Sequence, residues 1–320
     1  MNRRRFTTAT ALLAIAPAVV AQARKPVKIG MLNPSGSRAW GEALKDALAD
    51  LGYREGAGAT LEHRDWGNEE ALPKRARELI EAKCDLVFAY GPEAPVRAMQ
   101  NARPPMPVVF IAVDFDPVAR GIVPDLRRPD RNTTGVYIPQ GALVAKRFEV
   151  LREVAPKARN FLVMSDVHSR DQVAAARTAA EASGVRLTLV EFHKPPYDLH
   201  GAFETARKAK VQGVVKLASP AFHLRRDEIA ELLLKHRLPA VGSSVQQAEA
   251  GYLMTLGPDT RKTTQRAARI ANRILKGAKA ADIPVEQADE VVLTLNAKIA
   301  KALGVTIPES IRARATRVVE

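Results

Sequence analysis

Short apolar runs alternate with amphipathic helical stretches along almost the whole chain. In the first part, predicted strands and helices follow one another at 27–32, 38–51, 60–65, 69–82, 85–89, 92–101 and 107–112. Residues 86–89 and 107–112 are apolar without interruption, which is typical of strands that helices cover on both faces of a parallel sheet. This part of the sequence therefore predicts a doubly wound α/β lobe.

The same alternation starts again in the second part of the chain. Strands are predicted at 160–165, 185–191, 213–217 and 239–241, and helices at 170–183, 201–209 and 225–236. Two successive units of this kind predict two doubly wound parallel-sheet lobes.

The C-terminal part contains isolated elements instead of a third unit. A strand is predicted at 252–256, a long helix at 259–276 and a strand at 291–295. These elements cannot form a core of their own, so we expect them to join the two sheets. Chain crossings are then expected near 137–140, 255–258 and 283–290. The predicted lobes are residues 24–138 with 257–284, and residues 139–256 with 285–320. Three crossings predict a hinge, with a cleft between the lobes.

The first 23 residues have the order of a signal peptide. Three arginines at 3–5 precede an uncharged, mostly apolar segment at 7–20, and a small-x-small cleavage site ends at Ala23. The apolar segment is shorter than the roughly 20 residues of a membrane-spanning helix. The arginines and Phe6 match a twin-arginine export signal, with the general secretory route as the alternative. Both routes predict a periplasmic mature protein.

Composition favours a protein that works without nucleic acid, metal or cofactor. The net charge is +14, but Lys and Arg are scattered among acids and aromatic residues make up 5% of the chain. Cys84 is the single cysteine and cannot form an internal disulfide. The six histidines contain no i,i+4 pair, and no phosphate loop or nucleophile elbow is present. We expect a monomer without membrane insertion of the mature chain, and no catalytic residues.

Segments spread over the mature chain carry a resemblance to a known family. They lie, in order, at 51–53, 107–110, 116–123, 128–135, 146–151, 235–240, 249–258, 274–279, 282–287 and 296–308. In these residues the chain resembles the periplasmic substrate-binding proteins of ABC importers, in their tryptophan/tyrosine-type branch. The resemblance implies a type I periplasmic binding protein fold with three crossings between lobes, which agrees with the order of the predicted strands.

Loops at the carboxyl ends of the strands supply the candidate ligand-binding residues, because ligands of doubly wound sheets lie there. The candidates are Ser35, Ser37, Tyr90, Gly91, Glu93, Asp114, Phe115, Asp116, Tyr137, Ser165, Asp166, Ser219, Phe222 and Ser243.

Several of these candidates have a structural alternative. Ser35 and Ser37 precede a helix, where hydroxyls and free N–H groups bind a carboxylate or simply cap the helix. Asp114 or Asp116 can pair with an ammonium group, but Asp116 can equally initiate the turn before Pro117. The aromatic candidates can pack against an apolar ligand, with core packing as the alternative for Tyr137.

The chain departs from the family pattern at these same loops. Residues 91–94 read Gly-Pro-Glu-Ala where the family usually has Gly-Thr-Pro-Ala, and Ser165-Asp166 stands where Trp-Asn-Pro is common. Ser243-Ser244 replaces an aromatic residue of the family. More acid and fewer rings lead us to expect an amino-acid-like zwitterion whose side chain need not be aromatic, with Asp116 holding its ammonium group.

The sequence thus predicts a periplasmic solute-binding protein. It captures a small molecule between two lobes and delivers it to the membrane permease of an ABC importer. The alternative is an exported ligand-binding sensor component that signals to a membrane receptor. An exported hydrolase needs a nucleophile and a base in the cleft, and the sequence offers no such pair.

Overall fold

The computed structural model describes residues 26–35, 37–129 and 132–320. Its first sheet contains parallel strands only. Its strand order is β11-β5-β4-β3-β1-β2. The strands are β1 (Val27–Pro34), β2 (Ala59–Trp66), β3 (Leu86–Gly91), β4 (Val108–Ala112), β5 (Thr133–Tyr137) and β11 (Glu286–Gln287). The helices of this lobe are α1 (Arg38–Ala49), α2 (Leu72–Glu81), α3 (Glu93–Ala102) and α10 (Thr260–Leu275), with 3-10 turns η1 (Glu69–Ala71) and η2 (Ala280–Asp282).

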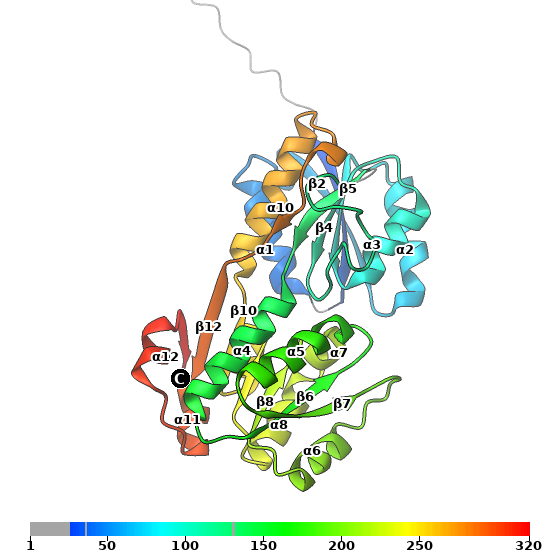
Figure 1. Cartoon of the computed structure of the whole chain (residues 1–320). Helices are drawn as coiled ribbons and strands as arrows, with labels where there is room; N and C mark the ends of the chain where they lie inside the picture. The colour runs from blue at the N-terminus through cyan, green and yellow to red at the C-terminus, as the bar shows by residue number, and fades with distance from the viewer. Residues whose placement is uncertain (1–25, 36, 130–131) are drawn as a thin grey trace, which may run out of the picture.

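Alternation along the strands explains how both faces of this sheet are covered. On β3, Leu86, Phe88 and Tyr90 pack with the apolar residues of α1 and α10, whereas Val87 and Ala89 pack with those of α2 and α3. Figure 1 shows α1 and α10 on one side of the sheet and α2 and α3 on the other.

The second sheet has the strand order β13-β12-β10-β9-β8-β6-β7, and only the β10–β12 pair is antiparallel. Its strands are β6 (Asn160–Ser165), β7 (Arg186–Glu191), β8 (Gly213–Lys216), β9 (Ala240–Gly242), β10 (Met254–Pro258), β12 (Val291–Asn296) and β13 (Arg317–Val319). The helices are α4 (Gln140–Val154), α5 (Arg170–Ala182), α6 (Leu199–Lys208), α7 (Pro220–Leu224), α8 (Arg226–Lys235), α9 (Val245–Ala250), α11 (Ala297–Leu303) and α12 (Glu309–Arg314).

The chain passes between the lobes three times, which confirms the predicted fold class. The crossings join β5 to α4, β10 to α10, and β11 to β12. At the last two, Asp259 N–H donates to Glu290 O (2.9 Å), and the Arg266 guanidinium binds the Glu290 carboxylate at 2.7 Å. β11 pairs with β5, so the segment at 286–287 belongs to the first sheet, a few residues beyond the expected boundary at 284.

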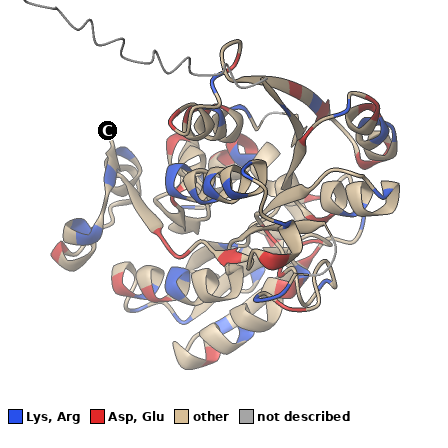
Figure 2. Ribbon diagram, turned by 90° about the horizontal axis from the view of Figure 1, so that it is seen from above, with Lys and Arg blue, Asp and Glu red and all other residues tan. Residues whose placement is uncertain are grey.

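The distribution of charged and apolar residues in the described part of the chain agrees with the scattered basic residues expected from the sequence. Figure 2 shows Lys and Arg spread over helices of both lobes with Asp and Glu among them. Within the part of the chain that the structure describes, no helix combines the length and apolarity needed to cross a bilayer. The predicted signal peptide lies outside the described residues.

Candidate functional site

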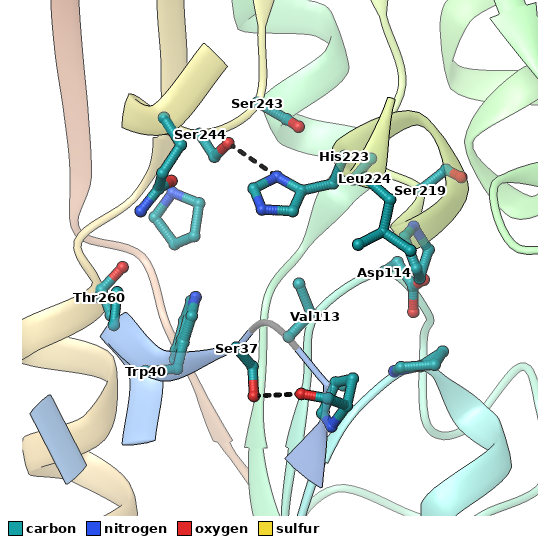
Figure 3. A pocket seen from close by; sticks show the side chains of 18 of the residues that line it. Ser37, Trp40, Val113, Asp114, Ser219, His223, Leu224, Ser243, Ser244 and Thr260 are labelled. Atoms are coloured by element: carbon teal, nitrogen blue, oxygen red, sulfur yellow. Dashed lines mark hydrogen bonds between the residues drawn. The ribbon is translucent and has the colours of Figure 1, made fainter. Parts of the chain in front are cut away.

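A cavity of about 260 Å³ lies between the two lobes, at the carboxyl ends of their strands. β1, β3 and β4 end at it from the first lobe, and β8 and β9 from the second. Figure 3 shows Trp40 and Val113 on one side of this space and His223 and Leu224 on the other. Ligand pockets commonly enclose about 300–1,000 Å³. At about 260 Å³ the cavity lies just below this range, so it suits a single molecule of small size.

Asp114 is the buried acid of the cavity wall. It follows β4, is 3% exposed, and its Oδ2 has no hydrogen-bond partner among the described residues. Burial, and next the negative charge of Asp166, raise the pKa of Asp114 to about 8. The empty protein therefore holds this carboxyl group protonated at pH 7. A ligand cation is the partner that would favour its ionised form.

Lys216 is the buried base on the second-lobe side of the cavity. It is the last residue of β8 and is 1% exposed. Its Nζ contacts Ser243 Oγ at 3.4 Å, and within the described ranges it forms no ion pair. Burial, followed by the charge of Arg147, lowers the pKa of Lys216 to about 7.

Two aromatic rings meet at the first-lobe wall. Trp40 of α1 and Tyr90 of β3 both line the cavity, with ring centroids 4.9 Å apart and planes 32° apart. Pro220, Leu224 and Val245 add apolar surface from the second lobe. Tyr90 was among the aromatic candidates of the sequence, whereas Trp40 was not. Such a wall suits a flat or apolar ligand group.

Hydroxyl and imidazole groups complete the polar part of the wall. Ser244 Oγ lies 3.4 Å from His223 Nδ1, as the dashed line in Figure 3 marks. Burial, and next the charge of Lys216, lower the pKa of His223 to about 4, so the ring is neutral at pH 7. Ser37 precedes α1 and donates from Oγ to Pro34 O at 2.7 Å. Ser219 caps α7 and donates to Asp166 Oδ2 at 2.5 Å.

Half of the predicted site residues line this cavity. They are Ser35, Ser37, Tyr90, Gly91, Asp114, Ser219 and Ser243. Gly91 has a φ of 118°, which a side chain would strain, and an added Cβ would lie 3.2 Å from Pro34 Cγ. The glycine thus lets β3 end directly at the cavity wall.

The predicted acids other than Asp114 are engaged elsewhere. Asp116 is exposed, and its Oδ1 accepts the N–H groups of Val118 (2.8 Å) and Ala119 (3.0 Å), so it shapes the turn. Asp166 lies behind the wall, where it accepts from Ser219 and from Ser169 Oγ at 2.8 Å. The structure therefore shows Asp116 in the turn role that the sequence left open as the alternative to ligand binding.

The remaining predicted residues also lie outside the lining. Phe115, Tyr137 and Phe222 are buried in apolar clusters, and Tyr137 donates to Gln287 Oε1 at 2.7 Å. Ser165, the last residue of β6, is buried and accepts the N–H of Phe192 through its carbonyl (2.8 Å). Core packing, which the sequence left open for Tyr137, is what the structure shows.

Glu93 belongs to an ion-pair group beside the cleft. Its carboxylate binds Arg97 (2.9 Å) and Arg120 (3.2 Å). Arg120, only 11% exposed, also reaches across to Asp171 of α5 in the second lobe at 2.5 Å. This group therefore links the two lobes at one edge of the cleft.

Sequence reasoning missed Trp40, Lys216, His223 and Ser244. Lys216 could have been found from the sequence, because it ends an apolar strand. If such a strand is central in its sheet, as β8 is, its lysine is buried and needs a polar partner. Trp40 lies in the first turn of the helix after β1, a position that also borders the strand ends. Among the described residues no cluster of acids, histidines or cysteines is arranged to hold a metal ion.

The sequence and the fold are similar to those of known proteins. A curated relative is the tyrosine-binding protein of Clostridioides difficile (strain R20291), 25% identical over 269 residues, which are 80% of this chain and 74% of the relative. The ABC domain of Streptococcus pneumonia in complex with L-Trp superposes with a TM-score of 0.82 and 23% identity, covering 92% of this chain and 100% of that one.

Two further matches agree. A conserved domain protein from Vibrio cholerae gives a TM-score of 0.83 at 23% identity, covering 92% of this chain and 100% of the other. These structural likenesses show the fold. The model of the family described as ABC transporter substrate binding protein matches residues 31–319. The chain therefore belongs to the ABC transporter substrate binding protein family.

Proposed function

We propose that the mature chain works in the periplasm, where it captures an amino acid with an aromatic side chain between its lobes and delivers it to the permease of an ABC importer. The observation that carries this proposal is the unpartnered Asp114 carboxyl group in a cavity walled by the Trp40–Tyr90 ring pair. An α-ammonium group can pair with the acid while a ring lies against the aromatic wall.

The names of the relatives support this ligand class. One is a tyrosine-binding protein, and another was solved with L-Trp. The signal-peptide pattern of the first 23 residues supports export.

Lobe closure is the proposed route from binding to delivery. Residues of both lobes line the cavity, so a ligand bound to one lobe gains contacts when the other closes over it. Ligand binding then shifts the population toward the closed form, which the permease reads. The Arg120–Asp171 ion pair is a further contact between the lobes.

The test is a binding screen with the mature protein. L-Tyrosine, L-tryptophan, L-leucine and a non-amino-acid carboxylate are compared by calorimetry and thermal unfolding. A ligand at 100 times its dissociation constant stabilises the protein by about 2.7 kcal/mol. We expect this for an aromatic amino acid, together with a smaller radius of gyration in X-ray scattering. No shift with either aromatic amino acid contradicts the proposed ligand class.

A further inference from the structure

Two buried cations of the second lobe, Arg147 and the cavity-lining Lys216, form no ion pair with a described acid. Arg147 is 0% exposed; its Nε donates to Leu256 O at 2.8 Å, and an Nη atom donates to Gln140 Oε1 at 3.2 Å. Its other Nη has no partner within the described part of the chain. Lys216 has only the Ser243 hydroxyl at 3.4 Å. Neither forms an ion pair with a described carboxylate.

This arrangement is unfavourable for an empty protein. A buried ammonium group without a counter-ion costs several kcal/mol. Arg147 cannot relieve Lys216, because its own positive charge disfavours the lysine's charged form. The charges of Asp166 and Asp114 favour the charged form of Lys216, but neither acid forms an ion pair with it, and Asp166 already accepts hydrogen bonds from Ser219 and Ser169. Among the described residues Lys216 therefore has no ion-pair partner, and it lines the space that a ligand enters.

We propose that Lys216 receives the carboxylate of the ligand, so that the cleft selects zwitterions over amines that lack a carboxylate. The inference rests on the proposed function and names the chemical feature that the ligand must carry. Arg147 does not line the cavity, but its positive charge acts on Lys216 and adds to the positive potential there. Ser243 and the neutral His223 provide hydrogen-bonding groups beside it.

The position of the two charges explains the selectivity. Asp114 stands on the first lobe and Lys216 on the second, so a zwitterion satisfies both when the lobes meet around it. An amine without a carboxylate satisfies Asp114 but leaves Lys216 buried and unpaired. A ligand of this kind loses one charge-assisted contact and also opposes closure.

The experiment compares two probes that differ only in the carboxylate. L-Tyrosine and tyramine are titrated calorimetrically into the mature wild-type protein, the Lys216→Met variant and the control Lys235→Met. Lys235 is exposed on α8, away from the cavity lining. Thermal unfolding of each variant verifies that it is folded.

We expect wild-type protein and the Lys235→Met control to bind L-tyrosine about 10- to 100-fold more tightly than tyramine. In Lys216→Met this ratio falls to within a few-fold of one, because tyrosine binds more weakly and tyramine does not. If Lys216→Met is unfolded, the wild-type ratio decides: equal binding of both probes overturns the proposal.

Two negative results are distinguishable. Tight tyrosine binding with an unchanged tyrosine-to-tyramine ratio in Lys216→Met overturns this inference and leaves the proposed function standing. Failure of the wild type to bind tyrosine, tryptophan or tyramine overturns the proposed ligand class and the inference together.

Discussion

Replacing Asp114 by asparagine tests the central feature of the cavity, a buried acid without a partner. The variant removes the ionisable group and keeps its size. In the empty protein the pKa of Asp114 is about 8 instead of its ordinary 3.8, first because of burial. The native state therefore holds one proton more than the unfolded state between these two pH values. Stability of the wild type must then fall as pH rises through this window.

The magnitude follows from the size of the shift. One proton changes the free energy of unfolding by about 1.36 kcal/mol per pH unit. Over the three pH units between the ordinary pKa and pH 7, this is about 4 kcal/mol. The charged groups that act on Asp114 are Asp166 and Asp171, which oppose its ionisation, and Arg120, which favours it. Asp114→Asn is thus expected to be more stable than wild type at pH 7, with the difference shrinking toward pH 4.

Urea unfolding of the ligand-free protein at several values between pH 4 and 8 measures this difference. Asp116→Asn is the matched control, since Asp116 is exposed and only shapes its turn. The same Asp114→Asn substitution is expected to weaken L-tyrosine binding by about 1.5–3 kcal/mol, the scale of a charge-assisted hydrogen bond. Parallel stability profiles for wild type and Asp114→Asn would refute the assignment of Asp114 as a protonated, unpaired acid.

Four other substitutions test contacts of the described residues and the predicted signal peptide. The pKa of Lys216 is about 7 instead of its ordinary 10.5. Lys216→Met should therefore raise the free energy of unfolding of the ligand-free protein most below pH 7, and this gain should vanish as pH approaches 10.5. Urea unfolding at about pH 6 and about pH 9 tests this. Trp40→Ala should weaken L-tryptophan binding about tenfold or more in calorimetry, whereas unchanged affinity would remove the ring pair from the site. Asp171→Asn breaks an ion pair between the lobes and should expand the empty protein in X-ray scattering, with a change in unfolding free energy under about 1 kcal/mol. Replacing the arginines at 3–4 with lysine should stop export if the twin-arginine route is used, and normal periplasmic yield would indicate general secretion.

The sequence by itself determined the architecture. Central strands such as Leu86–Gly91 and Val108–Ala112 are continuous apolar runs because both of their faces are buried, and the helices between strands show one apolar face. These are local patterns, so the two lobes and the three crossings were predictable. The strand ends were predictable for the same reason, which placed Asp114, Tyr90 and Ser219 among the candidates at the cavity.

Only the tertiary structure decided which side chains face the cavity. Asp114 and Asp116 are two residues apart and chemically identical, yet the turn after β4 buries one and directs the other to its own backbone. Trp40 and Lys216 reach the same space from elements more than 170 positions apart in the chain. That Lys216 forms no ion pair with a described acid is likewise decided by packing, because burial and the distances between partners arise only when both lobes are assembled.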